Sequence, residues 1–112
     1  MKTVEIKIAQ EFSRYPAGRF RTDGPASGER FREDYLIPAL KAGNRLLIDL
    51  DGTRGYGSSF LEEGFGGLRR KGFSEKQIRE AIEFKTSDSS LVDEIWENVV
   101  HGLDEEKKDG SD

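Results

Sequence analysis

The stretch LLIDLDGTRGYGSSFLE, residues 46–62, decides the fold of this chain. Its first five residues form an apolar run, which is typical of a central strand covered on both faces of a parallel sheet. A glycine-rich loop follows, and Ser59 and Glu62 then have the spacing of a capping box, in which two side chains cap the start of a helix. The stretch therefore predicts a buried strand, a loop and a helix, as in α/β proteins.

The segments before this stretch predict two strands and a helix. Alternating apolar residues at Val4, Ile6 and Ile8 indicate a half-buried first strand, and a short extended piece is expected around residues 19–21. Ser27 is a candidate N-cap for a helix that runs to about residue 42. Pro38 should kink that helix or end its regular part, because proline lacks the N–H that the helix needs.

The segments after it predict two more helices and a last strand. Residues 74–77 have capping-box spacing for a short helix, and residues 82–85 alternate as a strand. Ser90 and Asp93 have the same spacing before an apolar stripe that predicts a final helix. Together the elements predict an α/β fold with a four-stranded, mostly parallel sheet in the order β-β-α-β-α-β-α, with helices packed on it.

Three glycines interrupt the helix predicted after Ser59. Gly64, Gly66 and Gly67 each weaken a helix by roughly 1 kcal/mol relative to alanine. Glycine has no side chain, which predicts that the backbone of this helix approaches something closely.

Composition limits the function classes. The chain has 112 residues, no cysteine and a formal net charge of −4, and no apolar run approaches the roughly 18 residues of a membrane span. We expect one domain, residues 1–103, and a disordered acidic tail, residues 104–112. A net acidic chain without cysteine or a signal segment favours a cytoplasmic protein that binds neither membranes nor nucleic acid. The oligomeric state stays open.

The string DLDGT, residues 49–53, is the strongest candidate for catalysis. It matches the aspartate motif of haloacid-dehalogenase-type phosphatases, which also need a downstream lysine, a further acidic pair and a longer chain. A receiver-type phosphoacceptor at Asp49 would need an acidic pair after the first strand, where the sequence has only Glu11. His101, the only histidine, is expected to interact with the end of the last helix. We therefore expect no catalysis, no metal and no cofactor.

The pair Ser58 and Ser59 is the candidate switch. Capping-box spacing gives Ser59 the structural task of capping the helix and leaves Ser58 just outside it. A phosphate on Ser58 would lie near the positive end of the helix and would add roughly −1.5 to −2 charges. A second candidate surface is the arginine cluster that could bind an acidic partner, at positions 14, 19, 21, 30 and 32.

In order and spacing, these segments resemble an STAS domain, the fold of anti-sigma-factor antagonists, and more closely a bacterial family of single-domain STAS-like proteins. The resemblance spans residues 3–101 and is carried by GRF (18–20), SGERFR (27–32), LIDLDG (47–52), SSF (58–60) and FG (65–66). It implies that Ser58 is the phosphoacceptor of a histidine-kinase-like ATPase, with Ser59 the less favoured position. Gly57 stands where the antagonists carry aspartate.

Two functions remain as expectations. The first is a non-catalytic regulatory domain that binds a protein through the loop and helix start, with candidate contacts Arg30, Asp51, Arg54, Tyr56, Gly57, Ser59 and Phe60. The alternative is a module that binds a small anion, such as a nucleotide or phosphate, or a weak phosphate-handling enzyme, through the loop at Asp49 and Asp51.

Overall fold

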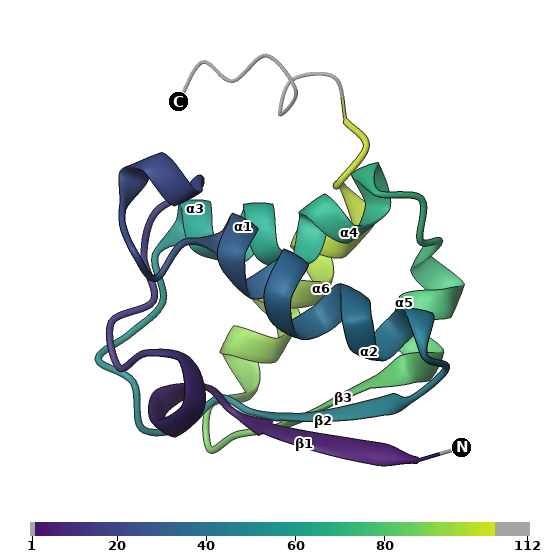
Figure 1. The fold of residues 1–112 in the computed structure, drawn as a ribbon, viewed down its shortest axis with the longest axis horizontal. Helices are drawn as coiled ribbons and strands as arrows, with labels where there is room; N and C mark the ends of the chain where they lie inside the picture. The colour runs from purple at the N-terminus through teal and green to yellow at the C-terminus, as the bar shows by residue number, and fades with distance from the viewer. Residues whose placement is uncertain (1, 105–112) are drawn as a thin grey trace.

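The computed structural model describes residues 2–104, and its sheet has three parallel strands. They are β1 (Thr3–Lys7), β2 (Arg45–Asp49) and β3 (Ile82–Lys85), in that spatial order. β2 is therefore the central strand, as the apolar run predicted. In Figure 1 the helices are stacked on one side of this sheet.

Two long helices connect these strands, and each contains a wider π-helical turn. The first joins α1 (Gly28–Phe31), the turn Arg32–Leu36 and α2 (Ile37–Lys41). The second joins α3 (Ser58–Leu61), the turn Glu62–Gly66 and α4 (Gly67–Arg70). Separate helices follow at α5 (Glu75–Ala81) and α6 (Ser89–Val100), and two further turns precede α1, a π-helical turn at Ile8–Phe12 and a 3-10 turn at Arg21–Asp23.

The predicted strand around residues 19–21 is wrong, so the described sheet has three strands and not four. This segment closes a turn on itself. The Phe20 N–H donates to Asp23 Oδ2 at 2.8 Å, and the Asp23 N–H donates to the Phe20 carbonyl at 2.8 Å. These local bonds occupy the N–H and carbonyl groups that a strand would use to bond a neighbouring strand, so the segment forms a turn.

The prediction that both faces of the central strand are covered is also wrong for the described chain. Leu46 and Ile48 are buried under the helices. Leu47 points to the opposite face, where it is only partly buried between the exposed Glu5 and Glu83 of the neighbouring strands. The helices therefore form one layer on one face of the sheet.

Two of the four predicted helix starts, those at Ser27 and Ser74, are confirmed. Ser27 Oγ accepts the Arg30 N–H at 3.1 Å, and Ser74 forms the predicted capping box with Gln77. The last helix begins earlier than predicted, because Asp88 caps it through the Ser90 N–H.

Pro38 does not end the first long helix. The turn before it is closed by the Ile37 N–H and the Arg32 carbonyl, five residues apart, and this wider turn gives the proline ring room.

The close backbone approach predicted from the glycines is confirmed, and it occurs where α1 crosses the second long helix. A Cβ atom at Gly28 would lie 2.5 Å from the Phe60 carbonyl oxygen and 2.8 Å from the Gly64 nitrogen. Gly66 is equally close to α6, since its Cβ would lie 2.8 Å from the Asn98 carbonyl oxygen. The crossing fixes the second helix, and with it Ser58, against the core formed by Phe31, Phe60, Phe65 and the inner sheet residues.

Of the predicted acidic tail, residues 105–112 lie outside the described residues, and the domain boundary stays a prediction. His101 is the C-cap residue of α6, and its Nδ1 lies 2.9 Å from Asp104 Oδ2. No helix in residues 2–104 is long and apolar enough to cross a membrane.

Candidate functional site

Two loops lie side by side where β2 leads into α3, at the left of Figure 1. We call them the paired loops, residues 13–24 and 51–57. The Arg54 N–H donates to the Arg14 carbonyl at 2.8 Å, and the Gly57 N–H donates to the Pro16 carbonyl at 3.2 Å. The start of α3 is thus held by a segment that is forty residues away in the sequence.

The start of α3 differs from the prediction. Gly57, with φ −64° and ψ 142°, is the N-cap, and its carbonyl accepts the Leu61 N–H at 3.1 Å. Ser58 is the first helical residue, so the prediction that Ser59 caps this helix is wrong. Both serines are already inside the helix, and no side chain caps it. Ser58 is exposed, whereas Ser59 is partly buried.

The start of α3 shows what kind of position Gly57 occupies, the one at which the antagonists carry aspartate. Aspartate is among the best N-cap residues, because its carboxylate accepts hydrogen bonds from the first helical amides. A Cβ atom at Gly57 would have only ordinary contacts, the nearest being Ala17 Cα at 3.5 Å. The position where the antagonists carry aspartate is therefore a capping position with room for it, and this chain leaves it without a side chain.

Three other predicted site residues have structural contacts. The Asp51 carboxylate accepts from the Ser87 N–H (3.1 Å) and the Thr86 hydroxyl (3.0 Å), and these bonds lower its pKa. Tyr56 donates its hydroxyl to the Leu50 carbonyl at 2.7 Å, and burial raises its pKa to about 12. Phe60 is fully buried, so its side chain cannot be part of a contact surface.

The predicted arginine cluster is not one surface. Arg30 packs over the Phe12 ring, with the guanidinium carbon 4.9 Å from the ring centroid, and donates to the Pro25 carbonyl at 2.8 Å. Arg21 pairs with Asp34 at 2.8 Å. Arg14 is exposed and makes no ion pair with any described residue. Arg14 lies beside Arg54, which is also exposed and also makes no ion pair with any described residue.

The geometry does not favour the predicted anion site. A hollow of about 530 Å³ does lie at the carboxyl ends of β2 and β3. It is lined by three acids, Asp51, Asp88 and Glu94, and the hydrogen bonds of Ser90 lower the pKa of Asp88. Ionised carboxylates repel an anion. Residues 2–104 contain no group of three or more acidic, histidine or cysteine side chains suited to a metal ion.

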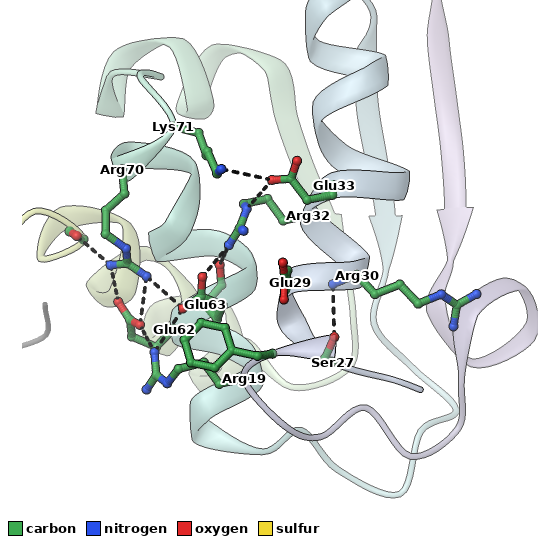
Figure 2. Close-up of polar contacts among 12 residues, drawn as sticks. Arg19, Ser27, Glu29, Arg30, Arg32, Glu33, Glu62, Glu63, Arg70 and Lys71 are labelled. Atoms are coloured by element: carbon green, nitrogen blue, oxygen red, sulfur yellow. Dashed lines mark hydrogen bonds and ion pairs between the residues drawn. The ribbon is translucent and has the colours of Figure 1, made fainter. Parts of the chain in front are cut away.

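Sequence reasoning missed a nearly buried ionic cluster, which Figure 2 shows. Arg32 Nη1 donates to Glu63 Oε2 at 2.7 Å, and Arg70 Nη1 donates to Glu62 Oε2 at 2.8 Å. Arg19 donates to both glutamates. Glu62 is 6% exposed, Glu63 8% and Arg32 4%, so the three charges are almost removed from water.

This ionic cluster, Arg19, Arg32, Glu62, Glu63 and Arg70, joins four parts of the fold. Arg19 belongs to the first paired loop, Arg32 to the first long helix and the other three residues to the second. Arg70 also donates to the Gly102 carbonyl after α6, at 2.7 Å. Burial alone would raise the pKa of Glu62, but Arg70 and Arg19 outweigh burial and lower it. The ion pairs of this cluster therefore hold the paired loops, through Arg19, against the helices.

The chain has a strand that leads through a glycine-rich loop to two serines at the start of a helix, within a small α/β fold, and this is the arrangement expected from the resemblance to STAS domains. The chain belongs to the family described as STAS-like domain of unknown function (DUF4325), whose model matches residues 27–91. The match includes the central strand and both serines, and it confirms the resemblance to STAS-like proteins. No curated protein and no solved structure matches the chain. STAS-like domains are generally non-catalytic and typically bind proteins.

Proposed function

We propose that this domain is a non-catalytic regulatory module that binds a protein partner through the paired loops and the first turn of α3. Phosphorylation of Ser58 controls this binding. The observation that carries the proposal is the position of Ser58, which is exposed and is the first residue of a helix without a side-chain cap. Its hydroxyl can therefore be modified without disturbing the core.

The helix start favours a phosphate. The first amides of a helix have no acceptor within the helix, and they bind anions well. Among the described residues no acceptor is found for the N–H groups of Ser58, Ser59 and Phe60. A phosphoryl group on Ser58 would accept from these amides, so modification would be accommodated at the helix start without unfolding it.

The phosphate would act through charge. The paired loops contain four arginines and two aspartates, a formal charge of +2, whereas the whole chain carries −4. A phosphoserine adds about −1.5 to −2 charges, which roughly cancels the positive charge of the loops. A partner that binds the unmodified loops would therefore be released.

The resemblance to anti-sigma-factor antagonists supports a kinase with a histidine-kinase-like ATP site as the partner, and a cytoplasmic setting. In such systems the unphosphorylated antagonist binds the kinase. Because Gly57 offers no carboxylate beside Ser58, recognition by that kinase would rely on the neighbouring Arg54 and the backbone of the loop.

The test is affinity capture from the native host with the wild-type chain and the variants Ser58→Asp and Ser58→Ala. Ser59→Asp and Ser59→Ala are matched controls on the next residue. We expect a partner that Ser58→Ala retains, that Ser58→Asp loses and that both Ser59 variants retain. Identical partners for the wild type and both Ser58 variants would refute the switch. Mass spectrometry of the chain from the host then locates any phosphate.

A further inference from the structure

We infer that the paired loops bind an acidic segment of a partner protein, with Arg14 and Arg54 as the charged contacts and Tyr15 and Phe20 as the apolar ones. The inference rests on the proposed function, because it names the chemistry of the partner at that site. It is carried by four observations: exposed aromatic rings, unpaired arginines, ordered loops and a charge opposite to that of the chain.

The first observation is the exposure of two aromatic side chains on one loop. Tyr15 is 64% exposed and Phe20 is 46% exposed. In residues 2–104 the only other exposed large hydrophobic side chains, Val100 and Leu103, lie near the end of α6. Aromatic residues and arginine are enriched in protein interfaces and among the residues that contribute most to binding.

The second observation is the state of the arginines. Arg19, Arg21 and Arg32 are paired with acids of this chain, at distances that leave their charges compensated. Arg14 and Arg54 are exposed and have no ion pair among the described residues, and a backbone hydrogen bond of 2.8 Å joins their two loops. Two uncompensated guanidinium groups therefore come from adjacent points of the paired loops. Guanidinium groups bind carboxylates well because two N–H donors match two oxygens.

The third observation is that the loops are ordered before any partner arrives. The Arg19 side chain is anchored on Glu62 and Glu63, and its carbonyl accepts the Glu29 N–H at 3.0 Å. The Gly18 carbonyl accepts the Gly28 N–H at 2.9 Å. A surface that is already fixed loses little conformational entropy on binding, so more of the contact energy contributes to affinity.

The fourth observation is charge. The loops carry a formal +2 in a chain of −4, and the Asp51 carboxylate among them is taken up by Thr86 and Ser87. An acidic segment is attracted to the loops, while the rest of the surface repels it. A phosphate on Ser58 would compete with such a segment for the same arginines, and this gives the switch a direct mechanism.

The test uses the full chain and a phage-displayed library of random peptides, about 12 residues long, so that no partner has to be known. Peptides enriched by the wild type are synthesised, and their affinities are measured by fluorescence polarisation. The binding variant is Arg14→Glu/Arg54→Glu. The matched control is Lys41→Glu/Lys76→Glu, which makes the same change in charge at two exposed lysines on α2 and α5. Circular dichroism checks that each variant is folded.

We expect enriched peptides that are rich in Asp and Glu and contain an aromatic residue. The binding variant should weaken their affinity roughly tenfold or more, while the control changes it less than about twofold. Raising the salt from about 50 to 300 mM should weaken wild-type binding, because exposed charges are screened.

No enrichment, or enrichment of neutral or basic peptides, would overturn the inference. So would equal losses in the binding variant and the control, or tighter binding of a single-stranded oligonucleotide than of any peptide. The outcomes separate the two proposals. If acidic peptides bind Ser58→Asp and Ser58→Ala equally well, the switch is refuted but the surface is not. If a host partner distinguishes these two variants but the peptides that bind the loops show no preference for acidic residues, the surface is refuted but the switch is not.

Discussion

The crossing of α1 with the second long helix allows a sharp test of the packing, because only one of its two glycines lacks room for a methyl group. At Gly28 a Cβ atom would lie 2.5 Å from the Phe60 carbonyl oxygen and 2.8 Å from the Gly64 nitrogen. At Gly64 the nearest atom outside its own helix would be 3.6 Å away, which is an ordinary contact. Gly28→Ala should therefore destabilise the fold, and Gly64→Ala should not.

The magnitudes follow from these distances. Non-bonded atoms are most favourable at about 3.5–4.0 Å, so a methyl group at position 28 must push the two backbones apart by roughly 1 Å. Overpacking of this kind costs about 1–3 kcal/mol, and we expect the upper half of that range because the obstructing atoms belong to the backbone. Gly64→Ala gains up to about 1 kcal/mol, since alanine favours a helix over glycine.

The assay is urea unfolding at 25 °C followed by far-UV circular dichroism, with thermal unfolding as a second measurement. The two variants should differ by about 3 kcal/mol in the free energy of unfolding, and by roughly 12 °C or more in Tm. Equal midpoints for Gly28→Ala and Gly64→Ala would show that the helices are not in backbone contact at this crossing, and the reasoning would then fail.

Three further predictions concern the cap and the ionic cluster. Gly57→Asp should raise the free energy of unfolding by about 0.5–1 kcal/mol, because the carboxylate caps α3 and lies at its positive end. Arg32→Met should lower it by about 3–5 kcal/mol, because Glu63 is left as a buried charge without this partner. The lowered pKa of Glu62 contributes stability above its ordinary value of 4.5, and this stability is lost as the pH falls below 4.5 towards the folded-state pKa.

Each of these predictions has a control, and urea unfolding measures all three. Gly57→Ala adds a Cβ atom without a carboxylate and should give no comparable gain, so equal gains would argue against capping. Arg21→Met breaks an exposed pair and should change the free energy of unfolding little, because solvent screens exposed charges, and an effect as large as that of Arg32→Met would contradict the role of burial. Between pH 7 and about 3, Glu62→Gln should lose less stability than the wild type, and parallel curves would exclude Glu62 as a cause.

The sequence predicted what depends on local patterns. The apolar run gave the central strand, and the hydroxyls at Ser27 and Ser74 gave two helix starts, because a capping residue bonds to amides within its own turn. The prediction failed at the start of α3, where Ser59 and Glu62 have the spacing of a capping box. The Glu62 carboxylate is bound by Arg19 and Arg70, so it is not free to complete the box.

The ionic cluster could not be predicted because its members are far apart in the sequence. Arg19 and Glu62 are separated by 43 positions, and neither residue has a local pattern that marks it as buried. The pair Glu62 and Glu63 was the one available signal, since two adjacent acids on a helix flanked by buried Leu61 and Gly64 cannot both reach water easily. The contact with Arg32 follows only from the packing of the first long helix, which begins with α1, on the helix that carries the two glutamates, and the sequence does not show this packing.

The arrangement of the sheet has a practical consequence for binding measurements. The strands run in parallel, so β1 begins at one end of the molecule, marked N in Figure 1, while the paired loops and α3 lie at the opposite end. A chain immobilised through its amino terminus on a sensor surface would present the loops outward. Coupling through Lys7 or Lys85, which project from the uncovered face of the sheet, would hold the molecule flat with the loops at its margin. Amino-terminal attachment is therefore the geometry in which kinetic measurements on this domain should be made.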